Sequence, residues 1–215
     1  MFFKYLDFII DNINAIAKRD VINNLNMVLP IGISFFTFQA MSYVIDVYRK
    51  DAEYQKNPFY MGLYISFFPQ LVAGPIVRYN TIEQLIKKRK TTIDDFSTGI
   101  NRFAIGLIKK ILLANNIAVL TDTIFELIKT GRSLYEVPAL MAWIGGIGYM
   151  LHIYYDFSAY SDMAIGLGKM LGFEYPRNFN HPYIAVNVTD FWKRWHISLT
   201  SWFREYLYIP MGGNR

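Results

Sequence analysis

NPFYMGLYISFFPQLVAGPIV, residues 57–77, contains no charged side chain over 21 positions. Two further segments, residues 27–45 and 137–155, are charge-free over 19 positions each, with His152 counted as neutral. An apolar helix needs about 20 residues to cross the hydrocarbon core of a bilayer. The three segments therefore predict a helical protein that crosses a membrane several times.

The composition of the whole chain agrees with a membrane location. Of the 215 residues, 53% are hydrophobic and 18% are charged, whereas soluble domains carry about 25% charged residues. The hydrophobicity excludes a disordered chain, and the absence of cysteine excludes a disulfide-stapled domain and cysteine metal sites. Buried helices of a soluble protein are the alternative, which the Gly, Pro and aromatic content of several such segments disfavours. We predict an all-α, polytopic integral membrane protein.

The net charge of +5 comes mostly from one short loop. Residues 78–90 hold five basic side chains and one acidic side chain, whereas residues 1–77 hold six of each. Because these basic residues lie beside predicted spans, they indicate topology rather than nucleic acid binding, and we predict that the loop faces the cytoplasm. The loop 49–56, with three basic residues, lies outside if 57–77 spans once, and on the same side if 57–77 is re-entrant.

Proline and glycine predict a break inside the first charge-free segment. Pro69 and the Gly74-Pro75 pair cannot continue a regular helix, so we predict a kinked or re-entrant backbone around residues 68–76.

A fourth apolar segment, residues 100–128, is interrupted by charge. Thr92 and Asp95 form a capping-box pattern that predicts a helix start near residue 93. We interpret the segment as one or two helices that span in part or lie at the interface. The interrupting residues are Arg102, Lys109 and Lys110.

Two carboxylates flank an apolar segment further along the chain. Asp156 and Asp162 lie in YYDFSAYSDMAIGLG, residues 154–168. Ionisable groups at membrane depth are costly, and they mark a functional site or a pairing partner. The spacing favours polar contacts between helices slightly over a catalytic role, with His152 one turn before Asp156 as a candidate partner. No third ligand stands at a useful spacing, so no metal site is predicted.

The motifs of soluble enzymes are absent from the sequence. It contains no G-x-S-x-G elbow, no P-loop and no G-x-G-x-x-G fingerprint. Gly166-Leu167-Gly168 is too short for a dinucleotide site and predicts close helix packing.

Aromatic residues are concentrated near the end of the chain, with 11 in the 36 residues of 173–208. Spacings of three and four positions predict one helix over 188–208, with His196 beside its aromatic face. By spacing alone, His196 is more typical of a helix histidine bonded to a nearby carbonyl than of a functional one. The aromatic face comprises Trp192, Trp195, Leu199, Trp202 and Phe203.

Five long segments of the sequence closely resemble the membrane-bound O-acyltransferase (MBOAT) family, in its bacterial alginate O-acetylation branch. The resemblance implies a multi-pass enzyme of the bacterial plasma membrane. Such an enzyme moves acetyl from cytoplasmic acetyl-CoA, without a bound cofactor, to an extracytoplasmic polysaccharide through a partner acyltransferase. The segments are LPIGISFFTFQAMSYVIDVYR (29–49), FFPQLVAGPIVR (67–78), GLIKKILLANNIA (106–118), YYDFSAYSDMAIGLGKMLGFEYPRNFNHPY (154–183) and DFWKRWHISLTSWFREYLYIPMGGNR (190–215).

The same resemblance indicates the site residues. His196 lies in the WHISL motif of the family's active-site region, and it becomes the candidate catalytic residue. A neutral imidazole can accept the proton of an attacking hydroxyl near neutral pH. The expected supporting residues are Trp195, Arg204, Asp156 and Asp162.

Family members extend beyond both ends of this sequence. They carry additional spans before the counterpart of Phe2, and after the counterpart of Arg215 a Trp-His-Gly segment with the principal catalytic histidine. We therefore expect residues 1–215 to form a single membrane-embedded unit, truncated at both ends, in which His196 assists. The alternative function is a non-catalytic scaffold, a transporter-like subunit or an inactive fragment. The basic residues of 78–90 are expected to meet anionic lipid or, less favoured, the phosphates of coenzyme A.

Overall fold

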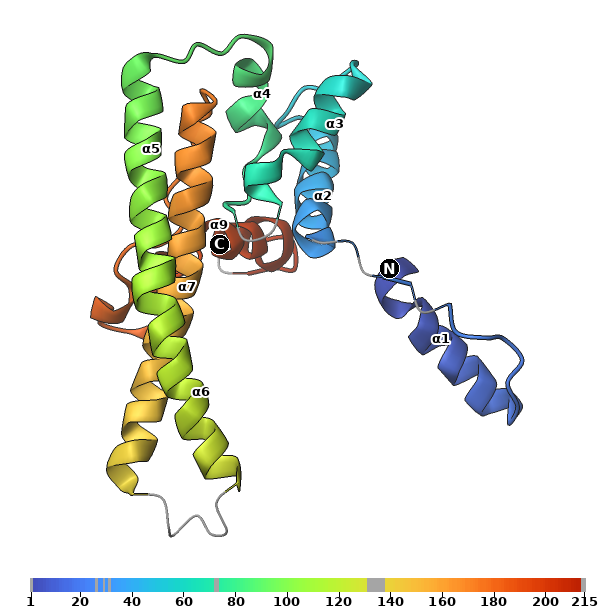
Figure 1. Ribbon diagram of the computed structural model, residues 1–215. Helices are drawn as coiled ribbons and strands as arrows, with labels where there is room; N and C mark the ends of the chain where they lie inside the picture. The colour runs from blue at the N-terminus through green and yellow to red at the C-terminus, as the bar shows by residue number, and fades with distance from the viewer. Residues whose placement is uncertain are drawn as a thin grey trace.

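The computed structural model consists of helices joined by short links (Figure 1). It describes residues 2–25, 27–28, 30, 32–71, 74–130 and 138–213, and these residues form no β-strand, so the predicted all-α fold is confirmed. The helices are α1 (Phe2–Ala17), α2 (Ile33–Arg49), α3 (Pro58–Ser66), α4 (Tyr79–Lys87), α5 (Ile93–Ile108), α6 (Asn115–Thr130), α7 (Ala139–Met170), α8 (Val188–Arg194) and α9 (Ile197–Phe203). Among the described residues there are also two π turns, Lys109–Ala114 and Arg204–Tyr208, and two 3₁₀ turns, Phe68–Gln70 and Pro182–Ile184.

One helical run among the described residues is long and apolar enough to cross a membrane. It comprises α5, the first π turn and α6, Ile93–Thr130, with 38 residues, and it contains an 18-residue window with a mean hydropathy of 1.7. The run begins at the predicted capping box, in which the Thr92 side chain accepts a hydrogen bond from the Asp95 backbone N–H at 3.1 Å. From the sequence, this run is predicted to span the membrane only in part or to lie at the interface, because three cations interrupt its apolar pattern.

The charge-free segments form different helices from those predicted. Residues 57–77 do not form one helix, because α3 has nine residues, and α2, with 17 residues, covers Ile33–Arg49 instead of 27–45. α2 begins after Gly32, whose backbone is left-handed (φ 76°). The third segment lies in α7, which is 32 residues long but contains glycines, tyrosines and a histidine that lower its hydropathy.

The segment 57–77 does not form one continuous helix. α3 ends at Ser66, and Pro69 lies in the 3₁₀ turn that follows. Figure 1 shows that the end of α2, the start of α3 and the link from α4 to α5 lie at the same end of the molecule. The predicted break is therefore confirmed, and the shared end agrees with the re-entrant one of the two arrangements that the sequence allowed.

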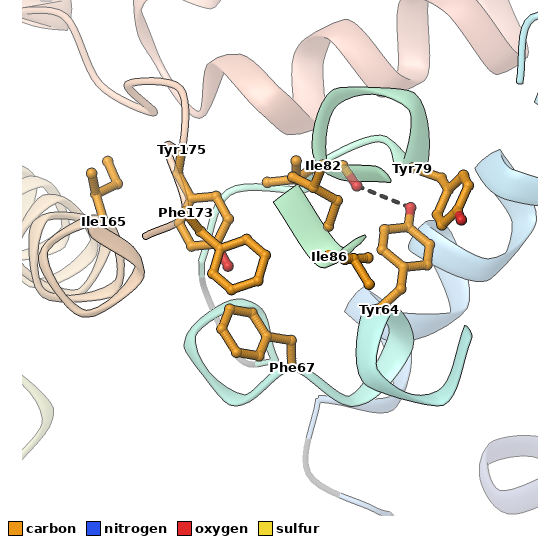
Figure 2. Close-up of a cluster of buried hydrophobic side chains, with 9 residues drawn as sticks. Tyr64, Phe67, Tyr79, Ile82, Ile86, Ile165, Phe173 and Tyr175 are labelled. Atoms are coloured by element: carbon orange, nitrogen blue, oxygen red, sulfur yellow. Dashed lines mark hydrogen bonds between the residues drawn. The ribbon is translucent and has the colours of Figure 1, made fainter. Parts of the chain in front are cut away.

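A cluster of buried side chains joins α4 to this re-entrant segment (Figure 2). The Tyr64 hydroxyl donates to the Val77 carbonyl at 3.0 Å, which ties the two sides of the turn together. Residues 78–90, expected as a surface loop, are thus largely an amphipathic helix with one buried face. The cluster comprises Tyr64, Phe67, Val77, Tyr79, Ile82, Ile86, Ile165, Phe173 and Tyr175.

Glycines allow α5 and α7 to pack with their backbones in contact, as predicted for the Gly166 region. A Cβ atom at Gly166 would lie 2.7 Å from the Gly99 carbonyl oxygen, and one at Gly106 would lie 2.7 Å from the Ala159 carbonyl oxygen. Small residues of this kind are what helices in a bilayer use to approach closely. This contact sets the spacing of the two helices that carry the charged side chains described below.

Gly166→Ala should therefore separate the two helices. Because the new methyl group would meet rigid backbone on α5, we expect a loss of about 1–3 kcal/mol in stability, measured as thermal unfolding of the detergent-solubilised protein. Gly146→Ala is the matched control on the same helix, since nothing lies within 4 Å of a Cβ atom there. Equal thermal stability of the two variants would contradict the close packing.

Candidate functional site

His196 lies at a sharp junction between two short helices. Its backbone is left-handed (φ 41°, ψ 57°), and it caps the N-terminus of α9 directly after α8 has ended at Arg194. The single helix predicted over 188–208 was therefore wrong. A non-glycine residue rarely adopts this conformation, so the surrounding structure must hold it in place.

Asn178 supplies the contacts that hold the junction. Its backbone carbonyl accepts a hydrogen bond from the Ile197 N–H at 2.9 Å. Its side-chain Oδ1 accepts from the Ser198 N–H at 3.1 Å and from the Ser198 hydroxyl at 2.9 Å. The Ser198 Oγ in turn accepts from the Ile76 N–H at 3.0 Å. The first N–H groups of α9 are thus satisfied from a distant segment, which explains why the helix restarts there.

The imidazole of His196 is enclosed by aromatic rings. His196 is 4% exposed, and the centroid of its ring lies 6.1 to 6.4 Å from the ring centroids of Phe35, Phe157 and Phe179. Neither ring nitrogen has a hydrogen-bond partner among the described residues. The expectation of a carbonyl partner was therefore wrong. Burial lowers the pKa of His196, so the ring is neutral near neutral pH and its basic nitrogen is free to accept a proton.

Trp195 organises the aromatic side chains around the junction. Its ring stacks on Phe191 with 5.6 Å between centroids, and it meets the edge of Phe179 at 5.1 Å. Phe179 contacts Trp195 and His196 together, so one ring links the two residues of the predicted motif.

Asp162 forms ion pairs between α7 and α5. Its Oδ1 accepts from Arg102 Nε and Nη2 at 3.2 and 3.0 Å, and its Oδ2 accepts from Lys109 Nζ at 2.7 Å. Asp156 pairs with Lys110 and not with His152, the partner that the sequence suggested. The π turn explains why Lys109 and Lys110 both face α7. Neighbouring residues in an α-helix are rotated by roughly 100° about its axis, and the wider π turn reduces this rotation.

A polar cavity of about 210 Å³ lies beside these ion pairs. Its walls come from α5, the π turn, α7 and the segment 177–181, and they include Ser158 and Asp162, the pair that helical spacing places on one face of α7. Phe179 lines the cavity and also contacts His196, so the histidine lies next to it behind one aromatic ring.

The structure brings only part of the predicted site together. Asp162 and Phe179 line the cavity, and Trp195 and His196 both contact Phe179. Asp156 is engaged by Lys110 instead. Arg204 is exposed and lines a separate hollow of about 780 Å³ with Trp192 and Lys193. Among the described residues, no group of three His, Asp or Glu side chains is placed to hold a metal ion.

Sequence reasoning missed Asn178, Ser161 and Ser198. Arg102 and Lys109 were noted only as interruptions of an apolar run. Cations inside such a run could have signalled partners on another helix, because an unpaired charge at membrane depth is costly. Nothing in the local spacing marks Asn178, since its contacts are made with residues at least 19 positions away.

Comparison with known proteins adds the family context. The sequence profile of the membrane-bound O-acyltransferase family, MBOAT, matches residues 54–215. A probable alginate O-acetylase, AlgI, of Pseudomonas putida is 44% identical over 217 residues, covering 100% of this chain and 43% of the relative. The peptidoglycan O-acetyltransferase of Helicobacter pylori is 38% identical, covering 100% of this chain and 44% of the relative. The teichoic acid D-alanyltransferase of Bacillus subtilis is 31% identical, covering 86% and 46%. The chain thus spans less than half the length of these curated relatives.

The Asn178–Ser198 contact should be measurable as stability. Ser198→Ala removes a hydroxyl that donates to Asn178 and leaves the Ile76 N–H without its acceptor. We expect a loss of about 1–3 kcal/mol, read from thermal unfolding in detergent. Ser97→Ala, an exposed change on α5, should leave the unfolding temperature unchanged. A Ser198→Ala protein as stable as this control would show that the contact does not hold the junction.

Proposed function

The chain belongs to the membrane-bound O-acyltransferase family, and we propose that it takes part in transfer of an acetyl group to a polysaccharide hydroxyl. The observation that carries the proposal is the state of His196, which is buried, neutral and without a hydrogen-bond partner among the described residues. A structural histidine in an interior normally has a partner for its ring. An imidazole whose ring nitrogens have no hydrogen-bond partner, next to a polar cavity, has the arrangement expected of a group that contacts substrate.

The chemistry proposed for His196 is assistance in accepting a proton. The acceptor hydroxyl donates a hydrogen bond to the open ring nitrogen, and its oxygen attacks the thioester carbonyl carbon as the proton passes to the ring. The carbon–sulfur bond then breaks, and the departing thiolate takes the proton back. The products are an ester and a free thiol, and the histidine returns to its neutral state. The left-handed junction fixes the imidazole in position, because Asn178 restrains the residues that follow it.

The donor and acceptor follow from the family and the relatives. We propose acetyl-CoA as donor, since relatives named as an alginate O-acetylase and a peptidoglycan O-acetyltransferase both transfer acetyl groups. The final acceptor is an extracytoplasmic polysaccharide, which the acetyl group reaches through a partner acyltransferase outside the membrane. The lipid bilayer of a bacterial plasma membrane surrounds the helices.

The donor side is assigned from the charges at one end of the molecule. The re-entrant segment brings the basic residues of 49–56 and 87–90 to the same end (Figure 1). Together these stretches hold seven basic residues, three and four respectively, against Asp51 and Glu53. Because cytoplasmic loops carry an excess of Lys and Arg, we propose that this end faces the cytoplasm.

His196→Ala should lower acetyl transfer about 100-fold or more, the usual contribution of a general base. The measurement is incorporation of labelled acetyl into polymer by membranes carrying the full-length protein, with immunoblotting to show equal amounts in the membrane. His152→Gln is the control, since His152 is a histidine of α7 outside the cavity. Transfer at the wild-type rate by His196→Ala would overturn the role of the histidine, and a scaffold function would then explain the chain better.

Cysteine labelling tests the topology directly, because the chain contains no cysteine of its own. We expect Glu53→Cys and Lys88→Cys to react with a membrane-impermeant maleimide only after cells are opened. Thr130→Cys, at the far end of the spanning run, should react in intact cells. Labelling of Glu53→Cys and Lys88→Cys from opposite sides would contradict the re-entrant arrangement.

A further inference from the structure

Tyr206 and Asp46 form a buried contact between the second π turn, which follows α9, and helix α2. The Tyr206 hydroxyl donates to the Asp46 Oδ1 at 2.6 Å, and the two residues are 8% and 2% exposed. The Asp46 Oδ2 is also buried and has no hydrogen-bond partner among the described residues. The two residues lie 160 positions apart in the sequence, so the contact ties the end of the chain back to α2.

Two arginines surround the ring of the same tyrosine. The guanidinium carbons of Arg49 and Arg78 lie 5.5 and 5.4 Å from the centroid of the Tyr206 ring, within the range of a cation–π contact. Arg78 forms an ion pair with Glu205, and Arg49 Nη1 donates to the Glu205 backbone carbonyl at 3.3 Å. The two arginines are matched by the carboxylates of Asp46 and Glu205. The cluster therefore balances its own charge, and it joins α2 and the start of α4 to the π turn.

α9 depends on contacts of this kind because it is too short to be stable alone. It has seven residues, whereas isolated helices shorter than about 12–15 residues are marginal in water. Asn178 holds its first turn, and the Trp202 Nε1 group donates to the Phe38 carbonyl of α2 at 3.1 Å. The bond between Tyr206 and Asp46 comes one turn later, so α2 holds this segment at two points.

α2 also contacts the imidazole at the other end of α9. The ring of Phe35 is nearly parallel to that of His196, with 11° between the planes and 6.4 Å between the centroids. The left-handed backbone of His196 persists only because the surrounding structure holds it. Release of the end of α9 from α2 would let this junction relax, and the imidazole would then shift against Phe35.

We propose that Tyr206 and Asp46 are positioning residues, which hold α9 against α2 and thereby fix the imidazole of His196 for proton transfer. This role rests on the proposed function. A polar pair suits it because a hydrogen bond has a preferred length and direction, whereas an apolar pair of the same shape gives similar stability without that constraint. A misplacement of about 1 Å can lower a rate about 100-fold, so a modest shift of α9 is measurable.

Tyr206→Phe in the full-length protein tests the pair, through acetyl transfer by membranes that carry equal amounts of protein. We expect kcat to fall about tenfold, with the KM for acetyl-CoA changed less than about twofold. Asp46→Leu should behave in the same way, whereas Asp46→Asn keeps an acceptor oxygen and should retain about half or more of the wild-type kcat. Tyr48→Phe is the matched control, since Tyr48 is an exposed tyrosine of α2.

A double variant, Tyr206→Phe with Asp46→Leu, separates positioning from stability. Because both polar groups are removed together, we expect it to unfold at about the wild-type temperature, while its kcat stays about tenfold below wild type. Recovery of kcat together with stability would show that the pair only fills space. Wild-type kcat in Tyr206→Phe would also overturn the proposal.

Hydrogen–deuterium exchange gives a measurement that does not depend on activity. We expect the amides of residues 197–203 to exchange about tenfold faster in Tyr206→Phe and in the double variant than in Tyr48→Phe. Faster exchange together with wild-type transfer by His196→Ala would show that the proposed function has failed, and the positioning role with it. If His196→Ala abolishes transfer while kcat and exchange in the double variant equal those of Tyr48→Phe, the proposed function stands and the positioning role falls.

Discussion

The pairing of Asp162 with Arg102 and Lys109 is the interaction on which the arrangement of α5 and α7 depends. Charges in or near a hydrocarbon environment are too costly to leave single, so each must find a partner on the neighbouring helix. The glycine contacts bring the two backbones close enough for these side chains to meet. The same three side chains line the polar cavity, so a structural constraint sets the composition of part of the candidate site.

The candidate site is built where regular helix geometry fails. The π turn directs Lys109 and Lys110 together toward α7, and the left-handed backbone at His196 separates α8 from α9. Departures of both kinds are sustained only when surrounding contacts compensate for them. At His196 those contacts come from Asn178 and Ser198, so the position of the imidazole is set by segments on either side of it in the chain.

Local rules predicted the features that depend on neighbouring residues. The Thr92–Asp95 capping box and the break at Pro69 appear as expected, because each follows from the chemistry of a few consecutive side chains. The prediction of one helix over 188–208 failed for the opposite reason. Its periodicity is correct within α8 and within α9, but hydrogen bonds from Asn178 make it more favourable to end one helix and start another. Periodicity alone contains no information about such a distant acceptor.

The sequence by itself determined the helical class, the membrane character and, through long motifs, the family. These properties depend on composition and on residues that are adjacent or one turn apart. The tertiary structure decided which charges pair, that the helix within 57–77 ends at Ser66, and that the imidazole is buried without a partner among the described residues. It also decided that the Tyr206 hydroxyl meets the carboxylate of Asp46. Those outcomes require helices separated by tens of residues to be placed against each other, and the energies that place them come from packing and pairing across that distance.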